Sequence, residues 1–519
     1  MKTRVELEQE NAQIRALLLQ KEAHYQTVIQ SKEAFIDQLK EALILARNHK
    51  FCKTTESLRS LQSELFNEVE QEADQSLSEL DDAGNSDDHI TVPAHKRKRT
   101  GRKPLPEDLP RVEIIYDLAD ADKVCPHDGH ALKAIGDKAS EQLDIIPMQI
   151  QVLRHVRKQY ACPCCNGFIR TASKPKQAIE KSQASAGLLS YIAVSKYADS
   201  LPLYRQSTIL GRFGIEMNRT TLANWMIRCG ELVQPLINQF EEHLLNARYL
   251  HMDETPVQVL NEVGKSAQSK SYMWVRSGSP PGLDEKIVLF DYDSSRSGDV
   301  PRRLLADYHG ALMVDGYEGY EPVCQEQDLT RLGCWVHARR KFVEVGKASK
   351  YKNSQAHYAI KLIAKLYAIE KSLKDTSAEI RFEQRLERAK PIIDKLRAWL
   401  DETQPKVAPK TKLGAALYYL NNQWPRLVAY LEDGDYPIDN NPAENAIRPF
   451  VVGRKNWLFS ASVSGAKASA NLYGLIETAK ANGVEPYAYL KRVFTELPNV
   501  SNYEEVDRLL PWNAESTVD

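Results

Sequence analysis

The stretch Tyr249-Leu250-His251-Met252-Asp253-Glu254-Thr255 has the composition of a β-strand that carries acidic side chains, and it runs on through 256–259. Working outward from it, the chain alternates apolar runs of strand length with one short helical segment. We expect strands at 249–259, 272–276, 286–291, 311–314 and 332–336, with a helix at 302–308 between the third and fourth strands.

The order of these elements is three strands, a helix, a strand and a strand. This is the element order of the ribonuclease H fold, whereas a doubly wound domain would alternate helix and strand more strictly. We therefore predict a multidomain α/β protein with a ribonuclease H-like core at 247–460.

Two aspartates are candidates for a site on this sheet. The apolar run 311–314 predicts a strand buried on both faces, so Asp315 would emerge at its carboxyl end, where α/β sheets bind ligands. Asp253 lies within the first strand, and because successive strand residues point to opposite faces, Asp253 and Glu254 should not both face one site. On spacing alone, an Asp-Gly turn would explain Asp315 and a strand-end cap would explain Asp253.

A third acid follows a long helical stretch, which we expect to insert into the core at about 345–432. The run 438–448 then predicts a helix with Asn441 as its N-cap and Pro442 at the first helical position. Glu444 would be the third helical residue, a place that a capping box alone can explain.

Composition describes an ordinary globular protein of several domains, with 519 residues and a net charge of -1 from 69 basic and 70 acidic residues. No apolar stretch approaches the roughly 18 residues of a membrane span. The N-terminus does not resemble a signal peptide, so we expect a cytoplasmic protein without a membrane partner. With so balanced a charge, any nucleic-acid surface must come from local segregation of basic residues.

The N-terminal region contains such segregation. Residues 1–50 carry apolar side chains at heptad spacing, which favours a coiled coil over one amphipathic helix folded back on its own chain. An acidic linker is predicted at 51–93 and a basic segment at 94–111. Six basic residues in that segment are dense enough to contact a phosphate backbone, although a solvated charged segment is the plainer alternative: Lys96, Arg97, Lys98, Arg99, Arg102 and Lys103.

Four of the eight cysteines lie between 125 and 165, which favours a metal site over a disulfide framework. Two cysteine segments bracket about thirty residues with strand-like alternation at 145–156, the layout of a zinc ribbon at 112–175. Cys162 and Cys165 have the spacing of a thiolate pair. The first half is incomplete, because Asp128 stands where a second thiolate belongs. The candidate ligands are Cys125, His127, Asp128, Cys162 and Cys165, and reduced cysteines without metal remain the alternative.

Residues 176–246 predict a helical domain, with helices at 188–197, 204–210, 220–232 and 235–245. Arg219, Thr220 and Thr221 follow a glycine-containing turn and could be the base-reading end of a helix-turn-helix. Helical pairs of this kind are also common in proteins that never touch DNA. A C-terminal helical segment is expected at 461–519.

Five short motifs then stand in a recognisable order: 251–255 (HMDET), 314–320 (VDGYEGY), 334–340 (CWVHARR), 439–444 (DNNPAE) and 453–457 (GRKNW). Together they resemble transposases of the insertion sequence 66 family, and the resemblance covers nearly the whole chain. It departs from the common family pattern at Asp128, where a cysteine is usual, and at Asn445, where arginine often follows the glutamate.

The resemblance implies a DDE transposase whose catalytic acids are Asp253, Asp315 and Glu444. Carboxylates suit Mg²⁺ or Mn²⁺, and three of them can hold two ions for phosphodiester hydrolysis and strand transfer. Arg448, Arg454 and Lys455 could grip phosphates beside this site, or form an ordinary basic surface.

The implied partners are the terminal inverted repeats of the element, target DNA, a second copy bound through the coiled coil, and companion proteins of the same element. The implied location is the bacterial nucleoid. A zinc-ribbon regulator with an inactive nuclease-like core is the alternative function.

Overall fold

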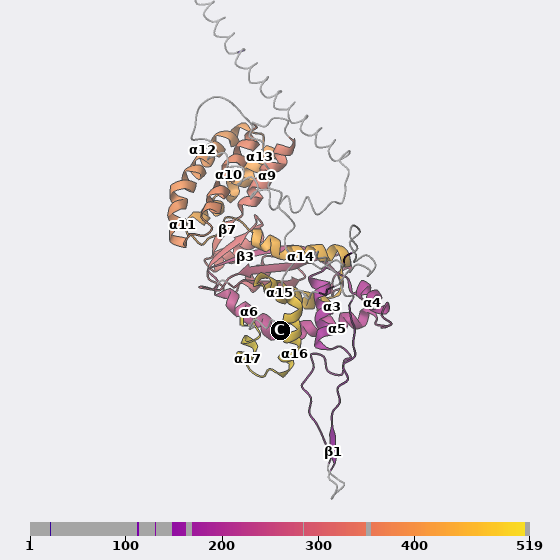
Figure 1. The fold of residues 1–519 in the computed structure, drawn as a ribbon. Coiled ribbons are helices and arrows are strands. Elements are labelled where there is room, and N and C mark those ends of the chain that lie inside the picture. Colours follow the sequence, from indigo (N-terminus) through magenta and orange to yellow (C-terminus); the bar gives the residue numbers. More distant parts are fainter. Residues whose placement is uncertain are drawn as a thin grey trace, which may run out of the picture. The chain divides into compact units, whose positions relative to one another are not determined.

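The structure is a computed structural model, and it describes residues 148–161, 169–283, 285–348 and 354–513, together with the single residues 21, 112, 113 and 130 (Figure 1). The chain divides into two compact units, one of 1–82 with 155–519 and one of 83–154. The predicted acidic linker and the basic segment lie outside the described residues, as does the coiled coil apart from Lys21. The first unit, from residue 155 onward, contains the sheets and the helices that pack on them.

A six-stranded mixed sheet occupies the centre of this unit (Figure 1). Its strands are β3 (Tyr249–Asn261), β4 (Lys270–Gly278), β5 (Ile287–Asp293), β6 (Ala311–Val314), β7 (Thr330–Gly333) and β8 (Ser460–Ser462). The order is β5-β4-β3-β6-β7, with β8 also paired to β3. β3, β4 and β5 pair antiparallel, whereas β6 and β8 run parallel to β3 and β7 runs parallel to β6. The predicted strand order along the chain is confirmed.

Two predicted elements differ from the observed ones by more than a residue or two at an end and in the kind of structure at their end. The strand expected at 332–336 is β7, which ends at Gly333, and Trp335 and Val336 instead begin helix α9 (Trp335–Ala348). Both side chains are buried, as they would be in a strand, and a short apolar run does not distinguish a strand from a helix. The helix expected at 302–308 is α7 (Asp299–Leu304), with Pro301 in its first turn and Leu305 already outside helical geometry.

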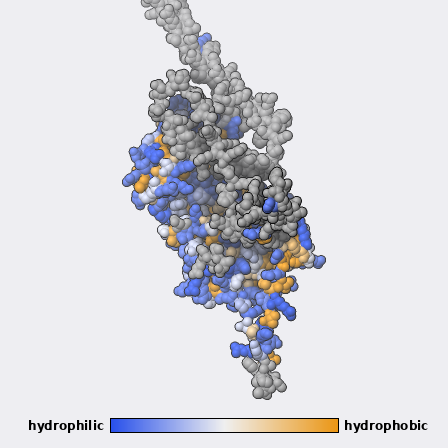
Figure 2. All heavy atoms as spheres, in the orientation of Figure 1, coloured by the Kyte–Doolittle hydropathy of each residue, from blue (hydrophilic) through white to orange (hydrophobic). Residues whose placement is uncertain are grey.

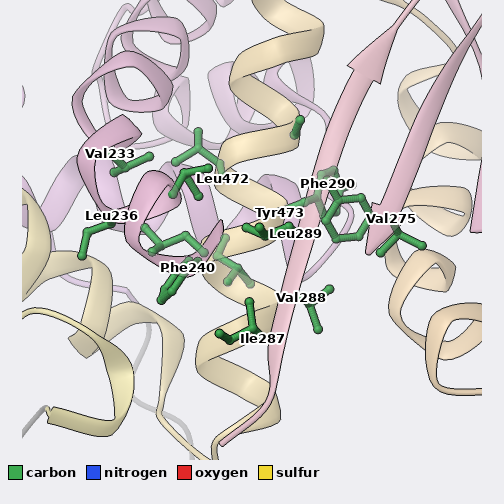
Figure 3. Close-up of a cluster of buried hydrophobic side chains, with 14 of the residues drawn as sticks. Val233, Leu236, Phe240, Val275, Ile287, Val288, Leu289, Phe290, Leu472 and Tyr473 are labelled. Carbon is green, nitrogen blue, oxygen red and sulfur yellow. The ribbon is translucent and has the colours of Figure 1, made fainter. Parts of the chain in front are cut away.

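Helices from both ends of the unit share one hydrophobic core with the sheet. They are α3 (Ala186–Tyr197), α4 (Leu203–Gly211), α5 (Arg219–Leu232), α6 (Gln234–Leu245), α14 (Asn441–Trp457), α15 (Val463–Ala481) and α16 (Pro486–Glu496), with short helices α8 (Glu321–Glu326) and α17 (Tyr503–Asp507) nearby. Figure 3 shows Phe240 of α6, Phe290 of β5 and Tyr473 of α15 in this core. The helices predicted between 188 and 245 are confirmed, and they share one hydrophobic core with the sheet.

Close approach of helices in this core depends on small residues. A Cβ atom added at Gly230 of α5 would lie 2.6 Å from Ala468 of α15. Farther along α15, the Thr478 hydroxyl donates to the Val288 carbonyl oxygen on β5 at 3.0 Å. Together these contacts fix α15 between the N-terminal helices and the edge strand of the sheet.

The helical insertion packs on the face of β6 that carries Ala311 and Met313. It consists of α10 (Gln355–Ser372), α11 (Ala378–Gln384), a π-helical turn (Arg385–Ala389), α12 (Lys390–Thr403) and α13 (Lys412–Val428). On β6, Leu312 and Val314 belong to the first core, whereas Ala311 and Met313 belong to this second one. The alternation explains why four consecutive apolar residues are needed there.

The two ends of the insertion, where the chain leaves the sheet domain and re-enters it, lie next to each other. The backbone N–H of Trp335, at the start of α9, donates to the carbonyl oxygen of Ile438 at 3.2 Å. The backbone N–H of Asn440 reaches Cys334 Sγ at 3.3 Å. Residues 335–438 therefore form an excursion whose two ends are hydrogen-bonded together.

A two-stranded hairpin precedes the helices, formed by β1 (Gln159–Ala161) and β2 (Ile169–Thr171). The strand expected at 145–156 is wrong over its described part, because residues 148–156 have no regular structure. Val152 and Val156 there are 93% and 69% exposed, so the alternation has no buried face to stabilise a strand. Figure 2 shows apolar and hydrophilic atoms interspersed over the described surface. Among the described residues, no helix is both long enough and apolar enough to span a membrane.

Candidate active site

Asp253 and Asp315 lie at the same level on neighbouring strands. The parallel register pairs His251 of β3 with Met313 of β6. Two residues further along each strand are Asp253 and Asp315, which therefore lie opposite each other just beyond the end of β6. The structure brings these two predicted acids together.

Asp253 experiences the charges of the other acids directly. Burial raises its pKa well above the ordinary range, and repulsion from Glu254, Asp315 and Glu444 raises it further. The backbone N–H of Glu254 donates to Asp253 Oδ1 at 2.8 Å and opposes this shift in pKa. The electrostatic coupling places all three predicted carboxylates in one neighbourhood, although they come from positions 191 residues apart in the chain.

Glu444 reaches this neighbourhood from α14, which begins at Asn441. The N-cap is Asn440, one residue earlier than predicted, and its side chain does not cap the helix. Its Nδ2 instead donates to the carbonyl oxygen of Met252 at 2.9 Å, and its Oδ1 lies 3.0 Å from Nδ1 of His251. The predicted N-cap, Asn441, is therefore wrong. The side chain of Asn440 instead links the start of α14 to β3, and this link positions Glu444 near Asp253.

His251 is the partner that makes this fastening specific. Burial lowers the pKa of His251 to about 4, so the ring is neutral at pH 7. Because the Asn440 amide nitrogen donates to Met252, its oxygen must accept, and the Nδ1–H of His251 is the donor. The first strand and the last helix of the site are thus joined through buried, paired polar groups.

The carboxylate of Glu444 is buried, with 8% exposure, and faces the first turns of α9. Arg340 donates to Oε2 at 3.3 Å, and Nδ1 of His337 lies 3.6 Å from Oε1. Burial raises the pKa of Glu444, and the Arg340 guanidinium opposes the shift. Burial also lowers the pKa of His337 to about 4, with Arg340 adding to the effect, so His337 is neutral beside Glu444 at pH 7.

Glu254 faces away from Asp253 as expected, because it is paired with Trp274 and binds Tyr320, whose ring packs on that tryptophan. Its carboxylate accepts hydrogen bonds from Arg296 Nε at 2.7 Å and from the Tyr320 hydroxyl at 2.5 Å. Arg296 in turn stacks on Tyr317, whose backbone N–H donates to Asp315 at 2.8 Å. Glu254 therefore holds the segment that carries Asp315, a role that no local sequence signal indicated.

Cys334 was also missed as a site residue. Among the described residues, its sulfur, a ring nitrogen of His337 and a carboxylate oxygen of Glu444 lie within 4.8 Å of one another. The spacing of Cys334 and His337 by three residues could have suggested a shared face at a helix start. Nothing local could have connected them to Glu444.

The predicted DNA-contacting residues fall into different settings. Arg219 and Thr220 are exposed at the start of α5, where Asn218 accepts from the backbone N–H of Thr221 at 2.8 Å. This end of α5 is open to solvent, while its other face packs against α15.

The basic residues of α14 are not equivalent. Arg448 lies near Glu444, where its charge opposes the rise in pKa that burial causes, and Lys455 is exposed. Arg454 is partly buried and donates to Thr255 Oγ1 at 2.9 Å and to the Pro256 carbonyl oxygen. Arg454 thus binds the backbone of β3, which favours a structural role over a phosphate contact.

The remaining candidates lie outside the described residues. They are the zinc ligands Cys125, His127, Asp128, Cys162 and Cys165, and the basic residues Lys96, Arg97, Lys98, Arg99, Arg102 and Lys103. Of this region, β1 is described up to Ala161, directly before the Cys162 to Cys165 pair.

Comparison with protein families decides the class of this chain. The model described as "Transposase IS66 family" matches residues 181–468, which include the sheet, the insertion and all three acids. The chain belongs to the IS66 transposase family. Three further models of such transposases match elsewhere: a zinc-finger binding domain at 122–166, a C-terminal element at 474–512 and a "Transposase C of IS166 homeodomain" at 38–114. The chain is therefore a transposase-family protein with DNA-binding and zinc-finger modules.

Relatives of this IS66-family protein occur in Sinorhizobium fredii (strain NBRC 101917 / NGR234), where they are named only as uncharacterized proteins. The protein y4jD is 32% identical over 79% of this chain and 81% of its own length. The protein y4qI is 31% identical over 86% of this chain and 82% of its own, and y4hP is 29% identical over 90% and 88%. No solved structure matches the chain.

Proposed function

We propose that this IS66-family protein is a DDE-type DNA transposase whose catalytic acids are Asp253, Asp315 and Glu444. The observation that carries the proposal is the convergence of these acids from β3, the end of β6 and α14: the paired register sets Asp253 beside Asp315, and the charges of both Asp315 and Glu444 raise the pKa of Asp253. Bringing like charges together in a buried place is unfavourable unless a cation joins them. Active sites are where such costs are tolerated.

The donor set fits magnesium or manganese. Carboxylate oxygens are the ligands that hard divalent cations prefer, and Asp253, Asp315 and Glu444 would hold two such ions. Bound there, two ions supply activation of a water or 3′-hydroxyl nucleophile and stabilisation of the departing 3′-oxygen.

The surrounding residues would keep the acids in place during the reaction. Asn440 holds the start of α14 against β3, and Glu254 holds the Arg296 and Tyr317 side chains behind Asp315. Arg340 and Arg448 bring positive charge close to Glu444. We expect them to balance the charge of a DNA phosphate entering the same site.

We further propose that the sheet is a ribonuclease H-like core. Support comes from its element order and from three antiparallel strands continued by two parallel ones. The fold class is what would place an aspartate of the first strand beside one at the end of the fourth.

DNA recognition is assigned to the modules outside this core. The basic segment at 94–111, the zinc module at 112–175 and the start of α5 would bind the terminal inverted repeats. The N-terminal coiled coil would pair two copies, and companion proteins of the element would act with them in the bacterial nucleoid. Trp457 is not assigned a role in stacking on a DNA base, because its ring packs against Phe450, with 5.4 Å between the ring centroids.

The test is a cleavage and strand-transfer assay on DNA carrying the ends of the element, with Mg²⁺ added or withheld. We expect magnesium-dependent products from the wild type and none from Asp315→Asn, with DNA binding retained. Asp307→Asn is the matched control, because Asp307 is exposed on the turn after α7. Equal binding by all three proteins with no cleavage by any would instead support a DNA-binding regulator.

A further inference from the structure

We infer that Cys334, His337 and Glu444 form a three-ligand site for a divalent transition-metal ion of the zinc class. The three donor atoms lie within 4.8 Å of one another, and Cys334 and Glu444 are buried. The inference goes beyond the proposed DNA chemistry, because it concerns a sulfur-containing site that can be loaded without DNA.

The fold builds this site from three elements. Cys334 ends the turn between β7 and α9, His337 lies in the first turn of α9, and Glu444 comes from α14. The sulfur of Cys334 accepts hydrogen bonds from the backbone N–H groups of Asn440 and His337. Burial raises the pKa of the Cys334 thiol well above its ordinary range, so the backbone donors hold the sulfur in place, and a bound metal ion would have to displace its proton.

Two of the candidate ligand atoms, Glu444 Oε1 and His337 Nδ1, face the proposed metal position. Within the described residues, neither Glu444 Oε1 nor His337 Nδ1 has a hydrogen-bond partner, although Glu444 is more than nine-tenths buried. The other oxygen of Glu444 is engaged by Arg340. A buried carboxylate oxygen left unpaired beside an imidazole nitrogen is costly, and a shared cation would satisfy both.

The separations suit a tetrahedral ion. Zinc bonds of about 2.3 Å to sulfur and about 2.0 to 2.2 Å to nitrogen or oxygen place neighbouring ligand atoms about 3.5 Å apart. The distance from His337 Nδ1 to Glu444 Oε1 is 3.6 Å. Sulfur and nitrogen donors select against magnesium, so this ion would differ in kind from those proposed at Asp253 and Asp315.

Three protein ligands leave a fourth position open, as in metal sites that bind water or substrate. Because Glu444 is shared, an ion held here would withdraw that carboxylate from the proposed catalytic pair. This consequence alone rests on the proposed function; the binding itself does not.

The experiment titrates the full-length protein with Co²⁺, which reports thiolate ligation by a charge-transfer absorption band, and counts bound zinc by elemental analysis. Cys334→Ser and His337→Gln are compared with wild type. Cys324→Ser is the control, because Cys324 is a buried thiol on α8 outside the cluster. Ligands of the zinc-finger module are present in every variant and cancel in the differences.

We expect Cys334→Ser to bind one metal equivalent fewer and to lose one thiolate contribution to the band. His337→Gln should bind the same equivalent at least tenfold more weakly, and Cys324→Ser should match the wild type. Equal stoichiometry and equal spectra in wild type and either cluster variant would overturn the inference. If Cys334→Ser fails to fold, His337→Gln decides, since its side chain is partly exposed. DNA cleavage is not measured, so failure of the proposed catalysis would not alter this result.

Discussion

Arg296 Nε lies 2.7 Å from Oε1 of Glu254, in an ion pair whose acid is only 2% exposed. Arg296 also lies over the Tyr317 ring, 4.0 Å from its centroid, and Tyr317 holds Asp315 by its backbone N–H. Glu254 is therefore connected to Asp315 through two side chains rather than by direct contact. It is a positioning residue, and its removal should be felt at Asp315.

We predict that Glu254→Gln weakens this connection without changing the shape of the side chain. Loss of a charged hydrogen bond should destabilise the fold by about 1–2 kcal/mol and lower DNA cleavage at least tenfold. Glu318→Gln is the matched control, because Glu318 is exposed and its ion pair with Arg426 is long, at 3.5 Å. Thermal unfolding and single-turnover cleavage report the two effects. Cleavage equal to wild type in Glu254→Gln would show that Asp315 needs no such support.

Removing one of the clustered charges should stabilise the protein while abolishing activity. Asp253 is buried among Glu254, Asp315 and Glu444, so Asp253→Asn relieves repulsion and should raise stability by about 1–2 kcal/mol in EDTA. Added Mg²⁺ should raise the melting temperature of wild type more than that of the variant. A lower melting temperature for Asp253→Asn in EDTA would mean that its carboxylate is stabilising, contrary to this account.

Lys196 provides a test by pH, far from the carboxylates in the chain. Burial lowers the pKa of Lys196 to about 8, beneath the rings of Tyr197 and Trp457. Between pH 8 and about 10.5 the unfolded chain keeps the proton that the folded protein has released, so wild-type stability should rise with pH relative to Lys196→Met. Below pH 8 the difference should be constant, with the variant more stable by about 1 kcal/mol.

Urea unfolding at several pH values between 7 and 10 checks this prediction. The exposed Lys467 supplies the control variant, Lys467→Met, which makes the same substitution on the surface of α15. A difference for Lys196→Met that stays flat through this range would contradict the lowered pKa.

Gly230 tests whether the N-terminal helices are integral to the core. Gly230→Ala places a methyl group against Ala468 of α15, and we expect a loss of about 1–3 kcal/mol despite the better helix propensity of alanine. Gly211→Ala is the control, because no atom lies within 4 Å of its added Cβ. Melting temperatures of the two variants should move in opposite directions or differ by several degrees. A neutral Gly230→Ala would indicate that α5 can separate from α15.

The sequence predicted best those strands whose side chains are buried on both faces of the sheet. The strand Ala311–Val314 was predicted with its observed bounds, because four apolar residues followed by Asp-Gly allow little else. The strand at 145–156 failed for the opposite reason: its alternation is real but packs against nothing in the described part. Trp335 was misassigned because a buried aromatic residue suits both strand and helix.

Prediction of the site followed the same physical division. Asp315 and Asp253 could be proposed from strand position, and Glu444 only through the family resemblance. Glu254 and Cys334 could not be recognised, since their partners Arg296 and Glu444 lie 42 and 110 positions away. The local pattern around Asn440 indicates only a neighbour of a helix cap, whereas tertiary contact with His251 and Met252 determines its role.

The hydrogen bonds between Trp335 and Ile438 and between Cys334 and Asn440 close off the helical excursion at its base. A loop closed in this way changes little in free energy when it gains or loses residues, because closure entropy grows only with the logarithm of length. Evolution is consequently free to lengthen or shorten the loops between these helices, whereas the helices themselves are needed to cover Ala311 and Met313 of β6. Glu444 would keep its position through every such change, as long as the two hydrogen bonds at the base of the insertion are kept.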